Sequence, residues 1–244
     1  MFSASPAPRG LERLQVGLQS VTEAYHDHGL LEATRLLWSG LRLAGTVRLF
    51  LFALSQPRPL PEAKEAARGH RFAFATERQL QQLCEQPGSG IEGMDVARVA
   101  RGTARCLTQW DGERLVGYAW VWNSPIAFIE EGVHLNLPDD AIYNYKSYTA
   151  PEYRGFAFQA LRHQVLLDRL APEGKRRLFG FVHHLNSNSL RGVRKSGYQK
   201  VGELRITKRG ERVHVSLVTD RDFWSDAARE VMPLPEFPRV YLTT

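Results

Sequence analysis

The chain has 244 residues, of which 43% are hydrophobic and 24% are charged. These shares are typical of soluble globular proteins and exclude a fibrous or intrinsically disordered chain. The two cysteines, Cys84 and Cys106, are too few for a disulfide framework and lack the spacing of a structural zinc site. We therefore expect no bound metal. Residues 1–10 show no secretory signal pattern, so we expect a cytoplasmic protein whose thiols are reduced.

Positive charge is concentrated in one part of the chain. The formal net charge is +6, and residues 154–209 contain 13 basic and 3 acidic residues. Such a region suits an anionic partner: a phosphorylated cofactor, an acidic carrier protein, nucleic acid or an anionic lipid surface. Alternatively, it is a solvated surface that only keeps the protein soluble.

The segment 36–55 has the length of a membrane-spanning helix, but Arg42 and Arg48 make spanning unfavourable. In a helix, one narrow polar stripe would hold Arg35, Ser39, Arg42 and Thr46. We therefore expect residues 30–55 to form a helix that lies in an interface. That interface is either the rest of the protein or an anionic membrane surface, which would make the protein peripheral to the inner membrane.

The proline-rich stretch Gln56–Pro61 ends the helical pattern and marks a boundary. An amphipathic helical extension is expected at residues 1–58 and a linker at residues 59–69. The residue pattern then predicts, in chain order, a strand at Arg71–Ala75, helices at Glu77–Glu85 and Ile91–Arg101, a hairpin of Cys106–Trp110 and Arg114–Trp122, a strand at Ile142–Thr149, a helix at Arg154–Leu170, a strand at Leu178–Val182, a helix at Ser187–Ser196, and strands at Tyr198–Thr207 and Val213–Thr219. This order indicates an α/β domain at residues 70–220, followed by a C-terminal tail at residues 221–244.

Two blocks of sequence carry a family resemblance. The block PEYRGFA at Pro151–Ala157 is similar to the PxxRGxG signature of the GCN5-related N-acetyltransferase (GNAT) superfamily, and NSNSLRGVRKSGY at Asn186–Tyr198 is similar to its NxxSxxxxxKxGF signature. One helix and one buried strand separate the two blocks, as in that family. The resemblance covers about residues 70–220 and implies a mixed, mostly antiparallel central sheet flanked by helices, with the helical extension added at the N-terminus.

The first block has the chemistry of an anion site. Pro151 ends a strand and Arg154 opens a helix, whose first backbone N–H groups lack partners and attract a phosphate. The resemblance implies that the pyrophosphate of coenzyme A is held by Arg154 and by the amides of Gly155, Phe156, Ala157 and Phe158. Ala157 and Gln159 stand where the family pattern has glycines, and both side chains crowd the approach of the phosphates.

In the second block, helix capping alone would account for Asn186, Ser187 and Gly197. The resemblance implies instead that Asn186 binds the pantetheine arm and that Ser189, with Arg191 nearby, lies close to the phosphate end of the cofactor. The family often has a tyrosine at the position of Val193, where it protonates the leaving thiolate. Here that proton is supplied by another residue, by water, or not at all.

Transfer of an acyl group from a thioester to an amine needs a neutral amine, a donor for the oxyanion and a proton for the thiolate. By resemblance, two strands diverge and a backbone N–H near Tyr148 faces the thioester oxygen. We predict Tyr148 and His183 as catalytic residues because both lie at strand ends that face this opening. Further titratable side chains near it are Glu130, Glu131, His134, Tyr143, Tyr145 and His184. His183 and His184 are not expected to share a metal, since neighbouring strand residues point to opposite faces.

The sequence therefore predicts an N-acyltransferase that uses acetyl-CoA or another acyl-CoA and a small-molecule or peptide amine. One alternative is transfer from an acyl carrier protein to an amino acid or amino sugar near the membrane. The other is a GNAT-fold module that binds a partner and has no activity, which the absence of a clear general base and the Val193 replacement favour. No nucleic-acid partner is expected, because neither an aromatic single-strand platform nor a helix-turn-helix accompanies the basic region.

Overall fold

The computed structural model describes residues 46–86, 88–128, 133–209, 212–219, 231–233 and 240–243. The elements given below belong to one compact unit, Arg48–Thr244, apart from the first two residues of strand β1. Among the described residues, no helix is long and apolar enough to cross a membrane.

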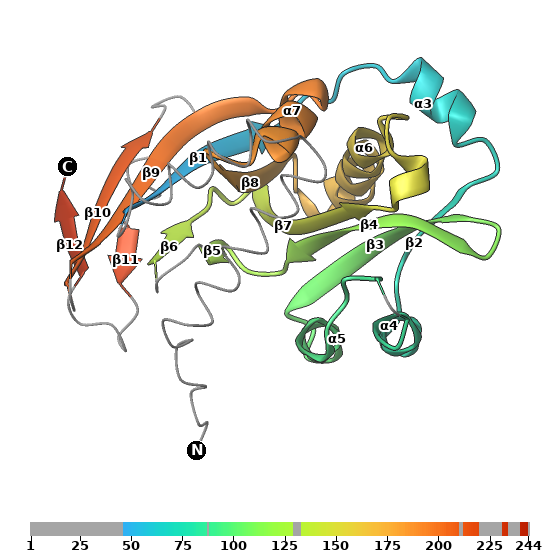
Figure 1. Ribbon diagram of the computed structural model, residues 1–244, viewed down its shortest axis with the longest axis horizontal. Coiled ribbons are helices and arrows are strands. Elements are labelled where there is room, and N and C mark those ends of the chain that lie inside the picture. Colours follow the sequence, from blue (N-terminus) through green and yellow to red (C-terminus); the bar gives the residue numbers. More distant parts are fainter. Residues whose placement is uncertain are drawn as a thin grey trace, which may run out of the picture. The chain divides into compact units, whose positions relative to one another are not determined.

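The centre of the fold is a mixed sheet with the strand order β12-β10-β9-β1-β8-β7-β4-β3-β2 (Figure 1). Its strands are β1 (Thr46–Leu54), β2 (Arg71–Phe74), β3 (Ala104–Asp111), β4 (Arg114–Trp122), β7 (Ala141–Thr149), β8 (Arg177–His183), β9 (Gln199–Arg209), β10 (Arg212–Thr219) and β12 (Val240–Thr243). The pairs β7–β8 and β10–β12 are parallel. The pairs β1–β8, β2–β3, β3–β4, β4–β7 and β9–β10 are antiparallel. A smaller sheet joins β5 (Ile126–Phe128), β6 (Val133–Asn136) and β11 (Val231–Pro233).

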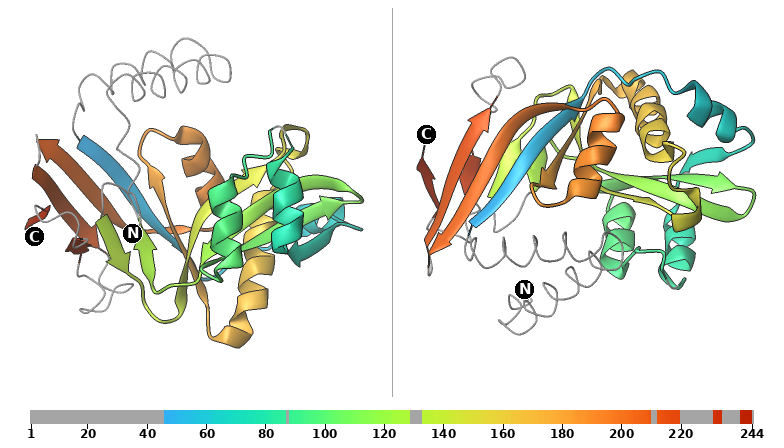
Figure 2. Two further views of the ribbon diagram at one scale, coloured as in Figure 1. Left: turned by 90° about the horizontal axis from the view of Figure 1, so that it is seen from below. Right: turned by 45° about the horizontal axis from the view of Figure 1, so that its top comes forward.

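Helices cover both faces of the large sheet. Helices α6 (Phe158–Leu170) and α7 (Ser187–Lys195) lie on one face, and α4 (Glu77–Cys84) and α5 (Gly93–Ala100) lie on the other (Figures 1 and 2). Leu166 and Leu170 of α6 pack with Leu54 and Leu178, whereas Leu80 of α4 packs under the opposite face. The expected α/β fold class, with a mostly antiparallel sheet flanked by helices, is confirmed.

The prediction of a helix over residues 30–55 is wrong for its last part, because Thr46–Leu54 form strand β1. This strand lies between β8 and β9, with Leu49 opposite His183 and Leu54 opposite Leu178. A strand in the middle of a sheet is buried on both faces and reads as a continuous apolar run, which periodicity cannot separate from a buried helix. Arg35, Ser39 and Arg42 lie outside the described residues, and Thr46 belongs to the strand.

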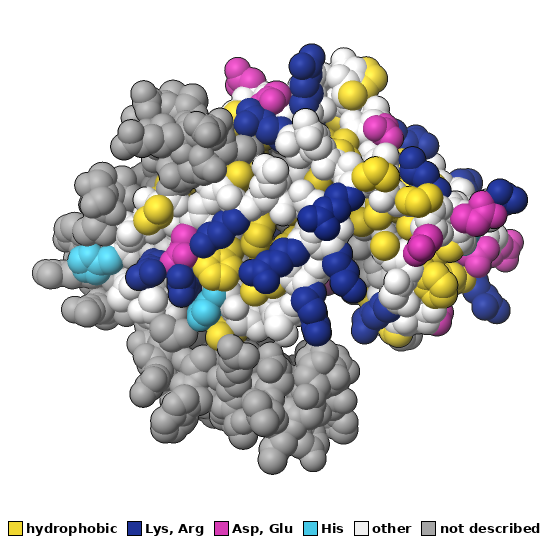
Figure 3. Space-filling view, turned by 90° about the horizontal axis from the view of Figure 1, so that it is seen from above, with side chains coloured by type: hydrophobic (Ala, Val, Ile, Leu, Met, Phe, Trp, Pro, Cys, Tyr) yellow, Lys and Arg dark blue, Asp and Glu magenta, His cyan; other side chains and the backbone are white. Residues whose placement is uncertain are grey.

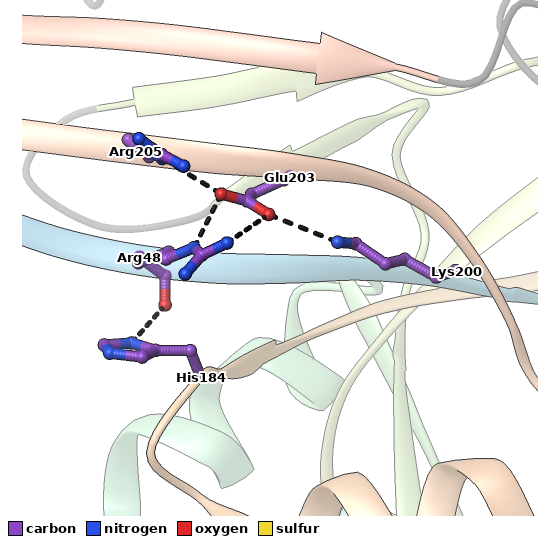
Figure 4. Close-up of polar contacts among 5 residues, drawn as sticks. All are labelled: Arg48, His184, Lys200, Glu203 and Arg205. Atoms are coloured by element: carbon purple, nitrogen blue, oxygen red, sulfur yellow. Dashed lines mark hydrogen bonds and ion pairs between the residues drawn. The ribbon is translucent and has the colours of Figure 1, made fainter.

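Ion pairs tie β1 to its neighbour β9. Both oxygens of Glu203 accept hydrogen bonds from Arg48, at 2.6 Å from Nε and 2.9 Å from Nη2, and Lys200 and Arg205 also donate to this carboxylate (Figure 4). These donors, Arg48 above all, lower the pKa of Glu203 to about 2. The carbonyl of Arg48 lies 3.1 Å from Nδ1 of His184, which follows β8. Arg48 therefore contributes to the sheet and does not belong to the helix expected over residues 30–55.

Two further boundaries differ from the sequence-based division. The expected linker at residues 59–69 contains helix α3 (Pro61–Ala66), whose Ala63 is buried in one cluster with Val116 and Phe158. The expected tail at residues 221–244 contributes β11 and β12, which pair with β6 and β10. Both segments belong to the sheet-containing unit. The predicted hairpin of Cys106–Trp110 and Arg114–Trp122 is confirmed. Asp111 pairs with Arg114, and Gly112, at a φ of 56°, and Glu113 form the turn.

Candidate functional site

Strands β7 and β8 diverge in the middle of the sheet. Their parallel register runs from Ala141 opposite Arg177 to Tyr143 opposite Phe179 and ends there. A cavity of about 130 Å³ lies in the opening beyond this point. It is lined by residues 144–147 of β7, residues 180–182 of β8, Gln159 and His163 of α6, Ser189 and Val193 of α7, Phe52 and Tyr198. The divergence that the resemblance implied is therefore present.

A larger groove of about 540 Å³ runs beside this opening, between the N-terminal end of α6 and helix α7. Ser147, Gln159 and Ser189 line both spaces, so the groove and the opening adjoin one another. Of the predicted site residues, the groove is lined by Tyr148, Arg154, Gly155, Ala157, Phe158 and Ser189. The fold thus brings most of the two sequence blocks together around one elongated space.

The N-terminal end of α6 has an irregular lead-in, which differs from the predicted helix start at Arg154. A short 3₁₀ turn at Pro151–Tyr153 comes first, and the helix begins at Phe158 with Ala157 as its N-cap. Gly155 has a φ of 95°, and Ala157 has a φ of 57° and a ψ of 23°, the left-handed conformation. No side chain caps the helix. Its first amides are therefore available to an anion in the groove.

Arg154 and Phe156 lie differently with respect to the groove. The Arg154 side chain is exposed and donates from Nε to the carbonyl of Thr149 over 3.3 Å, which leaves it beside the groove. The Phe156 ring stacks on buried Phe158 at 5.5 Å and does not line the groove. The side chain of Phe156 is 52% exposed, which is high for an aromatic residue.

Helix α7 shows that the capping explanation of the second block holds for Asn186. Its Oδ1 accepts a hydrogen bond from the amide of Ser189 at 2.9 Å, and Asn186 lines neither space. Ser189 lines both spaces, and Arg191 and Lys195 of the same helix line the groove. Val193 is buried in the core and also faces the opening.

The structure separates the two predicted catalytic residues. Tyr148 lines the groove, and its ring stacks on that of Tyr118 with 5.3 Å between the centroids. His183 ends β8 and lines neither space, while its Nδ1 accepts from the amide of Leu185 at 3.3 Å. Burial first, and then His184, lower the pKa of His183.

Among the other titratable candidates, Glu130 and Glu131 lie outside the described residues and His134 is in β6. Tyr143 and Tyr145 lie in β7, and burial raises the pKa of Tyr145. The rings of His183 and His184 are 4.9 Å apart, closer than alternation along a strand predicts, because His184 follows the strand end. No group of three or more metal-binding side chains occurs in the described part of the chain.

Sequence reasoning missed the buried polar groups behind the opening. His163 of α6 is 1% exposed, with Nε2 at 3.1 Å from the hydroxyl of Ser147 and Nδ1 at 3.1 Å from that of Tyr198. Burial and the nearby Arg162 lower the pKa of His163 to about 3, so the imidazole is neutral. Buried Arg162 donates to the Tyr148 carbonyl at 2.7 Å and to Thr149, holding the end of β7. These residues come from separate elements, and no spacing in the sequence links them.

The face of the sheet that carries α7 is strongly basic. Figure 3 shows Lys and Arg side chains spread across this face. Arg154, Arg191 and Lys195 line the groove, while Lys200 and Arg205 stand beyond it on β9. Some of the basic residues counted in the segment 154–209 thus line the groove itself, where their charge favours an anionic ligand.

Comparisons with known proteins found similar solved structures but no match in sequence. No family model matches this chain, and no curated protein matches it in sequence. Similar solved structures include a putative GNAT-family acetyltransferase from Novosphingobium aromaticivorans, with 15% identity over 66% of this chain and 62% of that one and a TM-score of 0.45. A second is a GCN5-related N-acetyltransferase-like protein from Streptococcus suis, with 12% identity over 71% of this chain and 66% of that one and a TM-score of 0.43. A third is a ribosomal-protein-alanine N-acetyltransferase from Brucella melitensis, with 14% identity over 52% of this chain and 89% of that one and a TM-score of 0.39.

The chain spans between 56% and 66% of the length of the first three structures that it matches. The family resemblance of this chain rests on the two sequence blocks, Pro151–Ala157 and Asn186–Tyr198.

Proposed function

We propose that the chain transfers an acyl group from a coenzyme A thioester to an amine. One observation carries this proposal: an elongated groove leads from the uncapped N-terminus of α6 to an opening between two diverging strands. Such a space suits a ligand with an anionic end and a narrow arm that delivers a reactive group to the interior of a sheet. An acyl-CoA thioester has that shape and charge.

The anionic end would lie at the start of α6. There the amides of Gly155, Phe156, Ala157 and Phe158 would bind the pyrophosphate, assisted by the positive end of the helix dipole. Arg154, Arg191 and Lys195 would add positive charge along the groove. Asn186 would act by holding the first turn of α7, which places Ser189 beside the arm.

The acyl group would lie in the opening between β7 and β8. Beyond Tyr143 the parallel register has ended, so a backbone N–H of β7 can donate to the thioester oxygen and to the oxyanion that forms from it. Tyr148 lines the groove and is retained as a catalytic candidate. His183 lines neither space, so we assign it no contact with the substrate.

The basic face favours a second donor, an acyl carrier protein. Such a carrier presents the same pantetheine arm without the rest of coenzyme A, so it needs less of the pyrophosphate site. Ala157 and Gln159, which crowd that site, and exposed Lys200 and Arg205 beside α7 fit an acidic carrier. The acceptor would then be an amino acid or amino sugar.

Titration and turnover separate these functions. Acetyl-CoA, longer acyl-CoA thioesters and an acyl-loaded carrier protein would each be titrated into the full chain by calorimetry. Release of free thiol would then be followed with a panel of small amines and peptides. We expect binding of an acyl-CoA and amine-dependent thiol release. Binding without release from any amine would favour an inactive binding module, and no binding of any of these donors would contradict the proposal.

A further inference from the structure

A continuous series of hydrogen bonds runs from the sheet interior to the opening between β7 and β8. The carbonyl of Trp120 accepts from Nδ2 of Asn144 at 3.0 Å, and Oδ1 of Asn144 accepts from the Ser147 hydroxyl at 3.2 Å. Ser147 Oγ lies 3.1 Å from Nε2 of His163, whose Nδ1 lies 3.1 Å from the hydroxyl of Tyr198. Ser147 is the member of this series that lines both the opening and the groove.

The chemistry of the groups fixes the direction of each hydrogen bond. A carbonyl only accepts, so Asn144 must turn its amide nitrogen to Trp120 and its oxygen to Ser147. The single proton of the Ser147 hydroxyl is then donated to Asn144, and Oγ accepts from Nε2–H of His163. A neutral imidazole with its proton on Nε2 has an acceptor at Nδ1, which takes the proton of the Tyr198 hydroxyl.

A β-bulge places Asn144 and Ser147 on the same face of β7. In the register with β4, Val121 is opposite Asn144 but Trp120 is opposite Lys146, so Tyr145 is an extra residue. Residues three apart normally point to opposite faces of a strand, and one inserted residue brings them to the same face. Bulges often direct a side chain into a site in this way.

We propose that Ser147 relays the proton to the leaving thiolate, a role that rests on the proposed acyl transfer. The amine nitrogen forms its bond to the thioester carbon, and the carbon–sulfur bond breaks with its electron pair moving to sulfur. When the thioester is bound, the Ser147 hydroxyl turns its proton from Asn144 Oδ1 towards sulfur. The amine then gives its surplus proton to Ser147 Oγ as the hydroxyl proton passes to sulfur. The serine ends unchanged, and coenzyme A leaves as the free thiol. The adjacent Val193 cannot perform this step because its side chain is apolar.

His163 and Tyr198 are positioning residues for this relay. The Nε2–H group of His163 occupies one lone pair of Ser147 Oγ and stabilises negative charge there while the proton passes. Tyr198 keeps the His163 proton on Nε2 by donating to Nδ1. Burial of both rings holds the imidazole neutral, which this arrangement requires, since an imidazolium has no acceptor for Tyr198.

The direct test uses coenzyme A itself and needs no acceptor. The ultraviolet absorbance of the bound thiolate would be titrated against pH in the wild-type chain and in Ser147→Ala. A hydroxyl that donates to the thiolate lowers the pKa of the bound thiol, so the alanine variant should raise that pKa by about one unit. Ser147→Thr retains the hydroxyl and should stay close to wild type.

Turnover supplies the second readout, with hydroxylamine as a small acceptor that fits most sites. Ser147→Ala should lower kcat about 100-fold, a usual loss for a missing proton-transfer group, with little change in the KM for acetyl-CoA. Tyr198→Phe should lower kcat less than Ser147→Ala and leave KM unchanged. Ser124→Ala is the matched control, because that hydroxyl lies after β4 and lines neither space of the site. Thermal melting confirms that each variant folds.

The outcomes separate this proposal from the proposed function. If coenzyme A binds and the pKa of its thiol is the same in wild type and Ser147→Ala, the relay is wrong while acyl transfer stands. An unchanged kcat in Ser147→Ala has the same meaning. If the wild-type chain binds neither coenzyme A nor acetyl-CoA, the proposed function fails and the relay fails with it.

Discussion

Replacing Ala157 with glycine should stabilise the protein. Ala157 is the one non-glycine residue with a positive φ in the described ranges, at 57°. The left-handed conformation costs an L-residue about 1 to 2 kcal/mol. Glycine avoids that cost but loses about 0.5 to 1 kcal/mol more backbone entropy on folding. The net gain is about 0.5 to 1 kcal/mol, which corresponds to an increase in Tm of about 1 to 4 °C for a chain of this size.

The assay is thermal melting of wild type, Ala157→Gly and a control, with urea unfolding as the second measure. The control is Ala97→Gly in the interior of α5, where glycine should cost about 1 kcal/mol. The two substitutions are chemically identical and have opposite expected signs, so a general effect of glycine cannot produce the result. A lower Tm for Ala157→Gly, comparable with that of the control, would refute the left-handed assignment. Titration of acetyl-CoA into the same variant measures what the methyl group does to donor binding.

Three further changes test other parts of the account. Arg154→Ala should weaken acetyl-CoA binding by about 1 to 3 kcal/mol without changing Tm, because the side chain is exposed, and calorimetry beside a melting curve checks both. Glu203→Gln should lower stability at neutral pH, since it loses its charged bonds to Arg48. The wild-type carboxylate contributes fully to the free energy of unfolding above pH 4.5, and this contribution is lost as the pH falls towards its folded-state pKa of about 2. Urea unfolding across this pH range should therefore show a loss of stability in the wild type that the variant lacks. Gly117→Ala should lower the free energy of unfolding by about 3 kcal/mol or more, because the added methyl group would clash with the carbonyl of Tyr148. Urea unfolding measures this loss.

Local patterns predicted the elements whose structure depends on nearby residues. The hairpin of β3 and β4 and helix α4, with Thr76 as its N-cap, each depend on only a few neighbouring residues, and both were predictable. Strand β1 was not predictable, since its apolar run fits a buried helix equally well. Only its partners β8 and β9, far along the chain, decide between the two.

The candidate site divides in the same way. The turn at the start of α6 and the cap of α7 could be located from the two blocks, because each is a local motif. The bulge at Tyr145 depends on the register between two strands, which spacing alone does not reveal. The contact of His163 with Ser147 and Tyr198 joins a helix to a strand and to the residue before β9, and a buried histidine on a helix face has no separate signal in the sequence.

The central place of β1 has a consequence for how the chain folds during synthesis. Arg48 and its partner Glu203 are 155 positions apart, so β1 emerges from the ribosome long before β8 and β9 exist to receive it. Contacts between such distant segments slow folding, and an apolar strand that waits for its neighbours is open to aggregation. A fragment that begins at residue 70 would lack β1 and would also be prone to aggregation. The strands β8 and β9 would each have an unpaired edge in the middle of the sheet. Residues 46–54 therefore cannot be removed as a detachable appendage.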